Sequence, residues 1–296
     1  MTFFLQLVIS GLSLGMMYAL IGVGFVVIFK CSKAFNIAAG QIVMLGAYVG
    51  YTFLKPCGLP VWLAILLSIA VAIILGLVVE RLALRPLLGQ PALAIVMMTI
   101  ALAGVMDGVA IMAWGGAYLT YHELLPDISL QLGSVSMASS SVLALAVSVV
   151  VVAALLVVFR FTKIGLAMRA TAEDEVVTRS LGIRATVVYA LSWVIACVVS
   201  VLAGVLLGGV SGVSPSLSDS GLKALSVVIL GGLDSVEGAV TAGIILGIAE
   251  NLAAGYLDPL LPSGGGLANV FPFLVMLLVL ILKPHGLFGL KTIERV

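Results

Sequence analysis

The sequence predicts an all-α integral membrane protein, a polytopic helical bundle of about eight to nine transmembrane segments. Of its 296 residues, 62% are hydrophobic and 9% are charged, whereas soluble domains are about 45–50% apolar and about 25% charged. The apolar runs are continuous, whereas the strands of a transmembrane barrel alternate apolar and polar residues. Stretches without Asp, Glu, Lys or Arg that are long enough to cross a bilayer as a helix are 1–29, 34–54, 56–79, 86–106, 128–159, 185–218 and 259–282.

The charged breaks between these runs set the expected helix ends and their orientation. Lys and Arg favour the cytoplasmic side of a membrane. An outside N-terminus and a cytoplasmic C-terminus place twelve of the fourteen Lys and Arg residues inside. We expect one membrane domain over 1–296, with helices near 3–29, 35–54, 59–79, 91–113, 138–159 and 187–209.

The region 222–256 must then cross twice, because only this brings the tail residues Lys283, Lys291 and Arg295 inside. Its first segment, 222–233, has twelve residues and would span about 18 Å at about 1.5 Å per residue. The hydrocarbon core is about 30 Å thick. We therefore expect a broken or re-entrant segment here, enclosed by the bundle, because irregular backbone at membrane depth must be buried or line a watery cavity.

Glycine pairs with G-x-x-x-G spacing place two bare backbone patches on one helix face. Such pairs favour close helix contacts, and packing within the subunit is the preferred interpretation over a dimer interface. The pairs are Gly11/Gly15, Gly46/Gly50, Gly204/Gly208 and Gly243/Gly247.

No residues in the chain indicate an enzyme or a metal site. Cys31, Cys57 and Cys197 are scattered without C-x-x-C spacing, so we expect buried thiols. The phosphate-binding loop G-x-x-x-x-G-K-[ST] is absent, so any ATP is used by another subunit and no cofactor is expected on this chain. No Lys/Arg cluster of the kind that binds nucleic acid is present.

Three polar residues within apolar runs are candidates for a substrate or ion pathway. Asp107 lies in the fourth expected helix, and Glu250 stands beside Asn251 near the end of another. Intramembrane ionisable residues are costly and therefore often functional, although each could also sit at a membrane boundary. An ion-coupled carrier would show acids in several spans, and the first three apolar runs have none.

The largest hydrophilic stretch, 160–186, is expected to be a cytoplasmic loop containing a short helix. Glu175 and Arg179 have the i, i+4 spacing that supports an exposed helix. The loop is either a docking helix for a cytoplasmic ATPase or a solvated connection. Its candidate docking residues are Arg169, Glu173, Asp174, Glu175, Arg179 and Gly182.

Several motifs are distributed along nearly the whole chain: 36–41 (NIAAGQ) with 44–48 (MLGAY), 80–87 (ERLALRPL), 165–183, 221–224 (GLKA) leading to 230–233 (LGGL), and 284–289 (PHGLFG). Together they resemble segments of the permease subunits of ABC importers for branched-chain amino acids. Four residues depart from the family pattern: Ala39 stands where His is usual, Gln41 where an acid is common, and Asp234 and Glu237 where Gly and Pro are common.

The resemblance implies a bacterial inner-membrane subunit that works with cytoplasmic ATP-binding subunits, a second similar permease and an extracytoplasmic solute-binding protein. It implies that Asn36, Gly40, Gln41, Gly231 and Gly232 line or shape the substrate route. The four departures leave room for urea, short amides or other small organic acids as substrates. The alternative of another class is an ion-coupled carrier or channel that acts alone.

Overall fold

The computed structural model describes residues 2–87, 89–121, 130–132, 135–261, 265–284 and 286–289. The chain is almost entirely helical. Its α-helices are α1 (Thr2–Ser32), α2 (Ala39–Leu54), α3 (Val61–Val78), α4 (Ala92–Trp114), α5 (Ser139–Phe161), α6 (Lys163–Glu173), α7 (Glu175–Ser180), α8 (Ala185–Ser211), α9 (Asp219–Gly231), α10 (Val236–Leu252) and α11 (Leu267–Leu282). Short π and 3-10 turns extend or join them: η1 (Val79–Leu84), η2 (Arg85–Leu87), η4 (Pro215–Ser218), η5 (Ala253–Leu257) and η6 (Asp258–Leu260).

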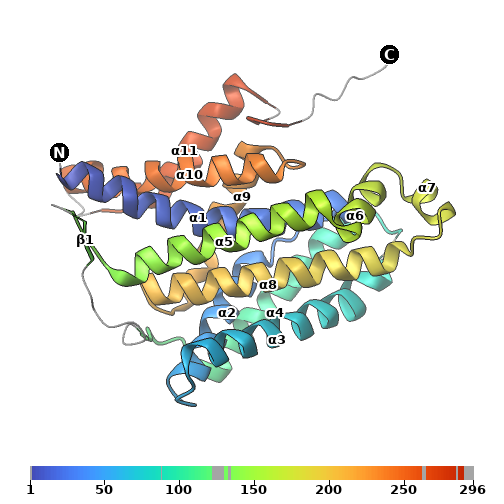
Figure 1. Ribbon diagram of the computed structural model, residues 1–296, viewed down its shortest axis with the longest axis horizontal. Coiled ribbons are helices and arrows are strands. Elements are labelled where there is room, and N and C mark those ends of the chain that lie inside the picture. Colours follow the sequence, from blue (N-terminus) through green and yellow to red (C-terminus); the bar gives the residue numbers. More distant parts are fainter. Residues whose placement is uncertain are drawn as a thin grey trace.

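The long helices lie side by side along the long axis of the molecule, with α1 at the centre (Figure 1). α1 packs most extensively against α10, and also against α8, α5 and α9. Within the described residues, six helical spans are long and apolar enough to cross a membrane, and α2 and α11 are shorter apolar helices. The prediction of a helical membrane protein is confirmed.

The outer helices present apolar side chains to their surroundings. Trp62 on α3, Met112 on α4 and Val150 on α5 are 65%, 89% and 66% exposed. Such exposure would be costly in water at about 25 cal/mol per Å² of apolar surface. In a bilayer the same side chains meet lipid or a partner subunit.

The predicted glycine pairs pack within the subunit, as expected. A Cβ on Gly15 of α1 would lie 2.5 Å from the carbonyl oxygen of Gly243 on α10, and a Cβ on Gly247 would lie 2.2 Å from Gly15 Cα. On the other side of the bundle, a Cβ on Gly204 of α8 would lie 2.0 Å from the Val43 carbonyl oxygen of α2. These close backbone approaches hold α1 to α10 and α2 to α8.

Four details differ from the sequence-based expectations. The second helix begins at Ala39 rather than near 35, because Lys33 leaves the helical conformation with φ +51 and the next residues are non-helical. The 160–186 loop contains two helices, since Asp174 ends α6 and caps α7 by accepting hydrogen bonds from the N–H groups of Val176 and Val177. Cys57 is exposed rather than buried.

The fourth difference is a small antiparallel hairpin that precedes α5. Its strands are β1 (Leu130–Leu132) and β2 (Val135–Met137).

Candidate functional site

Two half-length helices, α2 and α9, begin next to each other inside the bundle. Each follows a stretch without α-helix, residues 33–38 before α2 and 212–218 before α9. A Cβ on Gly40 would lie 2.0 Å from the Ser218 carbonyl oxygen, and a Cβ on Gly221 would lie 2.4 Å from Gly40 Cα. Only residues without a side chain allow this contact, which brings the N-terminal ends of two helices together.

A cluster of polar side chains lies beside the start of α9, in which Tyr18 and Glu250 are buried, Lys223 is partly buried and Asn269 is exposed. Lys223 Nζ donates to Glu250 Oε1 on α10 at 2.6 Å and to Asn269 Oδ1 on α11 at 3.0 Å. The Tyr18 hydroxyl on α1 donates to the same Glu250 oxygen at 3.3 Å. The side chains of Lys223 and Glu250 are 13% and 9% exposed. A buried ion pair of this kind offsets its desolvation only when both charges are present.

Two members of this cluster, Tyr18 and Glu250, lie near the middle of candidate membrane spans. Tyr18 stands close to the midpoint of α1, a helix of 31 residues that is about 46 Å long at about 1.5 Å per residue. Glu250 lies just past the middle of the apolar span Val236–Leu260. Charges at this depth are rare and typically mark a pathway or binding site.

A cavity of about 480 Å³ opens next to the cluster between α1, α8, η4, α9 and α11. Its polar lining includes Ser216, Asp219, Lys223 and Asn269, and its apolar lining includes Leu14, Leu207 and Phe273. Small-molecule sites usually fall between about 300 and 1,000 Å³ and combine apolar walls with a few polar groups. The cavity has both properties.

A second polar group links the start of α2 to α4. Gln41 Nε2 donates to Asp107 Oδ2 at 3.4 Å. The Thr99 hydroxyl lies 2.8 Å from the Val96 carbonyl of its own helix and 3.3 Å from the Phe35 carbonyl, and it accepts from the N–H of Ile37 at 3.4 Å. The contacts with Phe35 and Ile37 serve the non-helical backbone that leads into α2, because backbone groups at membrane depth must be satisfied within the protein.

Asn36 lies in the same backbone segment and is only 2% exposed. Its Oδ1 atom has no hydrogen-bond partner among the described residues. Asn36, Gly40, Gln41 and Asp107 are therefore brought together around the start of α2, as a group separate from the Glu250 cluster.

The other predicted pathway residues have packing contacts elsewhere. A Cβ on Gly231 would lie 2.4 Å from the Gly238 backbone, and Gly232, with φ +104, packs against Gly289. Both glycines stand at the turn between α9 and α10, where the N–H groups of Leu287 and Phe288 donate to the carbonyls of Leu230 and Gly231. Asn251 Nδ2 donates to the Leu7 carbonyl at 2.9 Å and so ties α10 to α1.

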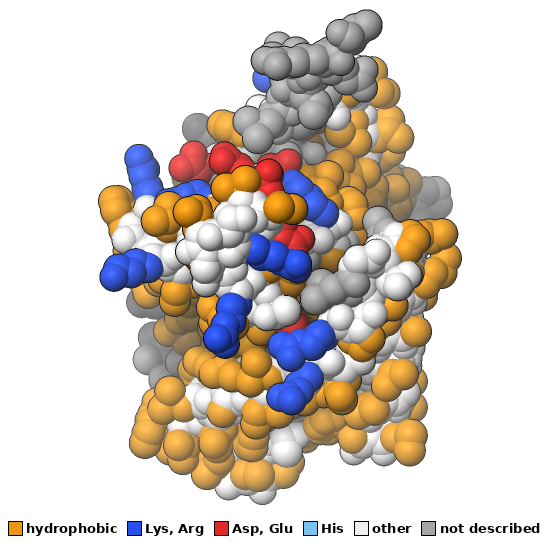
Figure 2. Space-filling model, turned by 90° about the vertical axis from the view of Figure 1, so that its right-hand side faces the viewer, with side chains coloured by type: hydrophobic (Ala, Val, Ile, Leu, Met, Phe, Trp, Pro, Cys, Tyr) orange, Lys and Arg blue, Asp and Glu red, His pale blue; other side chains and the backbone are white. Residues whose placement is uncertain are grey.

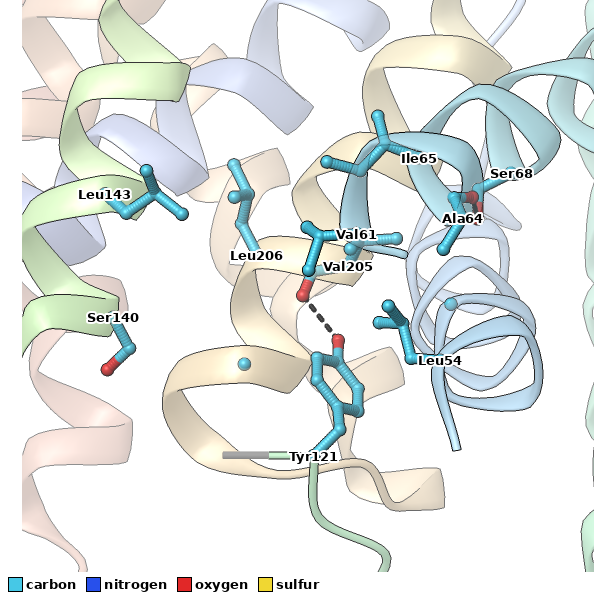
Figure 3. Close-up of a pocket in the computed structure, with 12 residues that line it drawn as sticks. Leu54, Val61, Ala64, Ile65, Ser68, Tyr121, Ser140, Leu143, Val205 and Leu206 are labelled. Carbon is cyan, nitrogen blue, oxygen red and sulfur yellow. Dashed lines mark hydrogen bonds between the residues drawn. The ribbon is translucent and has the colours of Figure 1, made fainter. Parts of the chain in front are cut away.

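A smaller pocket lies between α2, α3, α5 and α8 and is almost entirely apolar (Figure 3). Its volume is about 70 Å³, well below the usual size of a ligand site. The Tyr121 hydroxyl points into it and donates to the Val205 carbonyl of α8. This pocket is a packing feature, and the larger polar cavity is the candidate site.

The end of the molecule that carries α6 and α7 is rich in Lys and Arg side chains (Figure 2). Arg160, Arg169 and Lys30 line one hollow there together with Asp234 and Glu237. Lys33 and Arg179 line another with Glu175.

The predicted docking residues have distinct positions at this end. Arg169 donates to the Phe159 carbonyl and so faces back onto α5, while Glu173 is exposed. Arg179 pairs with Glu175 on the exposed face of α7. Gly182, with φ +83, lies at the surface, and no atom stands within 4 Å of the position that a Cβ would take there.

Most of the sequence matches a known transporter family. The family described as branched-chain amino acid transport system, permease component, matches residues 7–280. The chain belongs to this permease family. The resemblance noted in the sequence is confirmed, and the permease is a multi-pass membrane protein.

Two curated relatives have the same degree of similarity. The permease is 30% identical to the high-affinity branched-chain amino acid transport system permease protein LivH of Salmonella typhimurium, over 99% of this chain and 98% of the relative. It is also 30% identical to the high-affinity branched-chain amino acid transport system permease protein BraD of Pseudomonas aeruginosa, again over 99% of this chain and 98% of the relative.

Among solved structures the permease resembles PsaBC from Streptococcus pneumoniae in complex with Fab. The TM-score is 0.50 and the sequence identity is 15%, with 96% of this chain and 93% of that chain covered. At that identity the likeness concerns the fold.

Three residues of the central cluster are not among the candidates predicted from the sequence. Lys223 is a single cation in an otherwise apolar segment, and the sequence marks it only as part of the GLKA segment. Tyr18 and Asn269 belong to distant helices, and nothing in their spacing connects them to Glu250. The sequence does mark Lys223 in one way, because it is a lone lysine among apolar and small residues. A charged residue in such a segment is a functional candidate for the same reason as Asp107 and Glu250.

Proposed function

We propose that the permease is the membrane-spanning subunit of an ATP-driven, binding-protein-dependent importer for branched-chain amino acids in a bacterial inner membrane. The observation that carries this proposal is the 30% identity to two permeases of high-affinity branched-chain amino acid transport systems over 99% of the chain. The polar cavity beside the middle of α1 supports it, because a route through a bilayer requires polar groups at that depth.

The proposed topology has an outside N-terminus and a cytoplasmic basic end. The crossings are α1 to α5, α8, the segment 212–231, α10 and α11. Lys33, after α1, pairs with Asp234, in the turn between α9 and α10, at 3.3 Å, so these two turns lie at one end of the bundle. The Lys and Arg side chains gathered there favour the cytoplasmic side (Figure 2).

The crossing 212–231 is broken in this proposal. α9 has 13 residues and covers about 20 Å at about 1.5 Å per residue, which is less than a hydrocarbon core of about 30 Å. The non-helical residues before it complete the distance. Their surroundings are protein and the polar cavity, which is where broken helices are tolerated in transporters.

The loop 160–186 docks on a cytoplasmic ATP-binding subunit. Three apolar side chains in it, Val176, Val177 and Leu181, are 75%, 55% and 73% exposed at the basic end, where lipid does not cover them in this topology. Exposed apolar groups next to Glu175 and Arg179 are typical of a protein interface with a polar rim. α6 connects this surface to the bundle through α5 and α8.

The remaining partners follow from the same architecture. A second similar permease completes the translocation pathway, and an extracytoplasmic binding protein delivers the amino acid at the outer end. Asn36, Gly40 and Gln41 shape the route at the start of α2, next to the cavity beside α9. Urea, short amides or other small organic acids are the alternative substrates, and an ion-coupled carrier is the alternative mechanism.

Uptake of radiolabelled leucine tests this function. The permease is reconstituted with its candidate partners in proteoliposomes, with and without enclosed ATP and added binding protein. Uptake that requires both supports the importer. If the binding protein stimulates ATP hydrolysis but leucine does not enter, the substrate is wrong. Uptake without ATP would overturn the importer mechanism in favour of a carrier.

A further inference from the structure

We propose that the cavity beside Lys223 binds the charged head group of the transported amino acid, with Lys223 contacting the carboxylate and Asp219 contacting the ammonium group. This inference rests on the proposed function and assigns the substrate-binding residues within it. It would make the permease recognise a zwitterion directly, in addition to any selection by the binding protein.

The spacing of the two charges on α9 suits a zwitterion. Asp219 and Lys223 stand four residues apart, and both line the cavity. Side chains at i and i+4 lie on one helix face with Cβ atoms about 6 Å apart. The carboxylate and the ammonium group of an α-amino acid are attached to one carbon, so both can reach this pair at once.

Lys223 retains hydrogen-bonding capacity toward the cavity. A lysine ammonium has three donors, and two of them are directed to Glu250 Oε1 at 2.6 Å and Asn269 Oδ1 at 3.0 Å. The third is available to a ligand. Because Glu250 already compensates the lysine charge, a ligand with no net charge fits this site better than a plain anion.

The start of α9 sets the order of the charges along the cavity. The first turn of this helix lines the cavity through Asp219, Ser220 and Leu222. The N-terminal end of a helix carries a partial positive charge that an acidic side chain in the first turn offsets. The Asp219 carboxylate therefore supplies the negative side of the site at the helix start, and Lys223, one turn further along α9, supplies the positive side.

The rest of the cavity suits an aliphatic side chain. Leu14 on α1, Leu207 on α8 and Phe273 on α11 contribute its apolar walls. Burying each additional methylene against such walls is favourable by about 0.8 kcal/mol in general. The combination of a paired charge and an apolar wall distinguishes an aliphatic amino acid from urea or a short amide, which lack both the charges and the aliphatic chain.

The first test removes the charges without leaving one buried alone. Asp219 is exposed, so Asp219→Asn should not disturb folding. Lys223→Met alone would leave the Glu250 carboxylate buried and uncompensated, so the double variant Lys223→Met/Glu250→Gln is used. Glu237→Gln, which changes an exposed carboxylate at the other end of α10, is the matched control.

We expect Asp219→Asn and the double variant each to lower leucine uptake at least about tenfold, while the binding protein still stimulates ATP hydrolysis within about twofold of the unsubstituted complex. Glu237→Gln should transport normally. Uptake at the unsubstituted rate by both cavity variants would overturn the inference and leave the importer proposal intact.

The second test measures ligand protection directly. Cys31 and Cys197 are buried and Cys57 is exposed, so Ser216→Cys in a Cys57→Ser background places one reactive thiol in the cavity. Leucine at millimolar concentration should slow its modification by a membrane-impermeant maleimide at least about threefold. Isopentylamine, 4-methylpentanoate and urea, which lack one or both charges, should not.

Each outcome of this test is informative. Equal protection by leucine and by an analogue lacking one charge would exclude zwitterion recognition. No protection by any compound, when the unsubstituted complex imports leucine, would exclude this cavity as the binding site. Absence of leucine uptake by the unsubstituted complex would instead count against the proposed function.

Discussion

Gly40 and Gly221 are in backbone contact where α2 and α9 begin, and a Cβ on Gly221 would lie 2.4 Å from Gly40 Cα. The contact is between two main chains, so no side-chain rotation can make room for a methyl group. It fixes the position of α9, and therefore of Lys223 two residues later, relative to α2.

We predict that Gly221→Ala abolishes leucine uptake. Separating two packed backbones costs about 1–3 kcal/mol or more in a well-packed core, and the shift would displace α9 from Glu250. Gly108→Ala in α4, where nothing lies within 4 Å of the added Cβ, should be neutral. Uptake in proteoliposomes and thermal unfolding in detergent check both variants. Normal uptake by Gly221→Ala would show that this contact is not required.

The docking surface gives a second prediction. Gly182 has φ +83, and its N–H donates to the Arg179 carbonyl at 3.0 Å. Proline cannot adopt that φ and has no N–H, so Gly182→Pro should distort the connection between α7 and α8. We expect binding-protein-stimulated ATPase activity and uptake to fall together by at least about tenfold.

The control for this variant is Gly58→Ala, at another surface glycine with positive φ and no atom within 4 Å of an added Cβ. It introduces a backbone strain of about 1–2 kcal/mol in the turn between α2 and α3, away from the proposed interface. If Gly182→Pro left both stimulated ATPase activity and uptake untouched, the loop would be only a connection between helices.

The exposed apolar side chains of the same loop support an independent prediction. Leu181 is 73% exposed, so Leu181→Asp should leave the permease folded but weaken its association with the ATP-binding subunit. Truncation of a hot-spot residue at the centre of an interface costs about 2 kcal/mol or more. Co-purification of the ATP-binding subunit measures the effect. Leu181→Met, which keeps the apolar surface, should bind normally, and equal binding by Leu181→Asp would place the interface elsewhere.

The buried ion pair gives a prediction about stability. Removing one partner of such a pair typically costs about 3–5 kcal/mol, because the other charge stays buried without compensation. Lys223→Met should therefore lower the unfolding temperature of the detergent-solubilised permease more than Lys223→Met/Glu250→Gln does. The opposite order would mean that Glu250 remains solvated in the single variant, and that the pair is not enclosed.

The helix positions are largely predictable from the sequence. The expected 91–113 and 187–209 correspond to α4 (Ala92–Trp114) and α8 (Ala185–Ser211). The thickness of the hydrocarbon core and the charged breaks limit where such helices can end. The predicted start of α2 is wrong because residues 34–38 are as apolar as a helix. Their backbone is non-helical, with Ala34, Asn36 and Ala38 buried in the bundle, and hydropathy does not detect this.

The candidate site is predictable only in part. Glu250 and Asp107 stand out because a lone acid in an apolar run is costly. The other members of its cluster cannot be identified from the sequence, because they are far apart in the chain. Lys223 is 27 residues from Glu250 and 46 residues from Asn269.

The glycines at 231 and 232 show a different limit of the sequence. They are expected on the route as part of a broken segment. In the structure their lack of side chains serves the turn between α9 and α10 and its contact with residues 286–289. The sequence shows that these two positions have no side chain, but only the structure shows which backbone segments pack against them.

Asp107 separates the importer from the carrier mechanism. Its carboxylate accepts a hydrogen bond from Gln41 Nε2 at 3.4 Å, and the carbonyl oxygen of an asparagine can accept the same bond. Asp107→Asn removes the charge and any ability to exchange a proton, while it keeps the shape. An ATP-driven importer should therefore retain leucine uptake within about threefold, since a neutral hydrogen bond differs from a charge-assisted one by about 1 kcal/mol.

A carrier that uses Asp107 as its ion or proton site would instead lose coupled uptake entirely in this variant. Uptake measured with ATP enclosed, and separately with an imposed proton gradient and no ATP, distinguishes the two mechanisms. If the importer mechanism holds, the unsubstituted complex shows no uptake driven by a proton gradient, and Asp107→Asn does not change that. Gradient-driven uptake that is present in the unsubstituted permease and lost in Asp107→Asn would favour the carrier and overturn the importer mechanism.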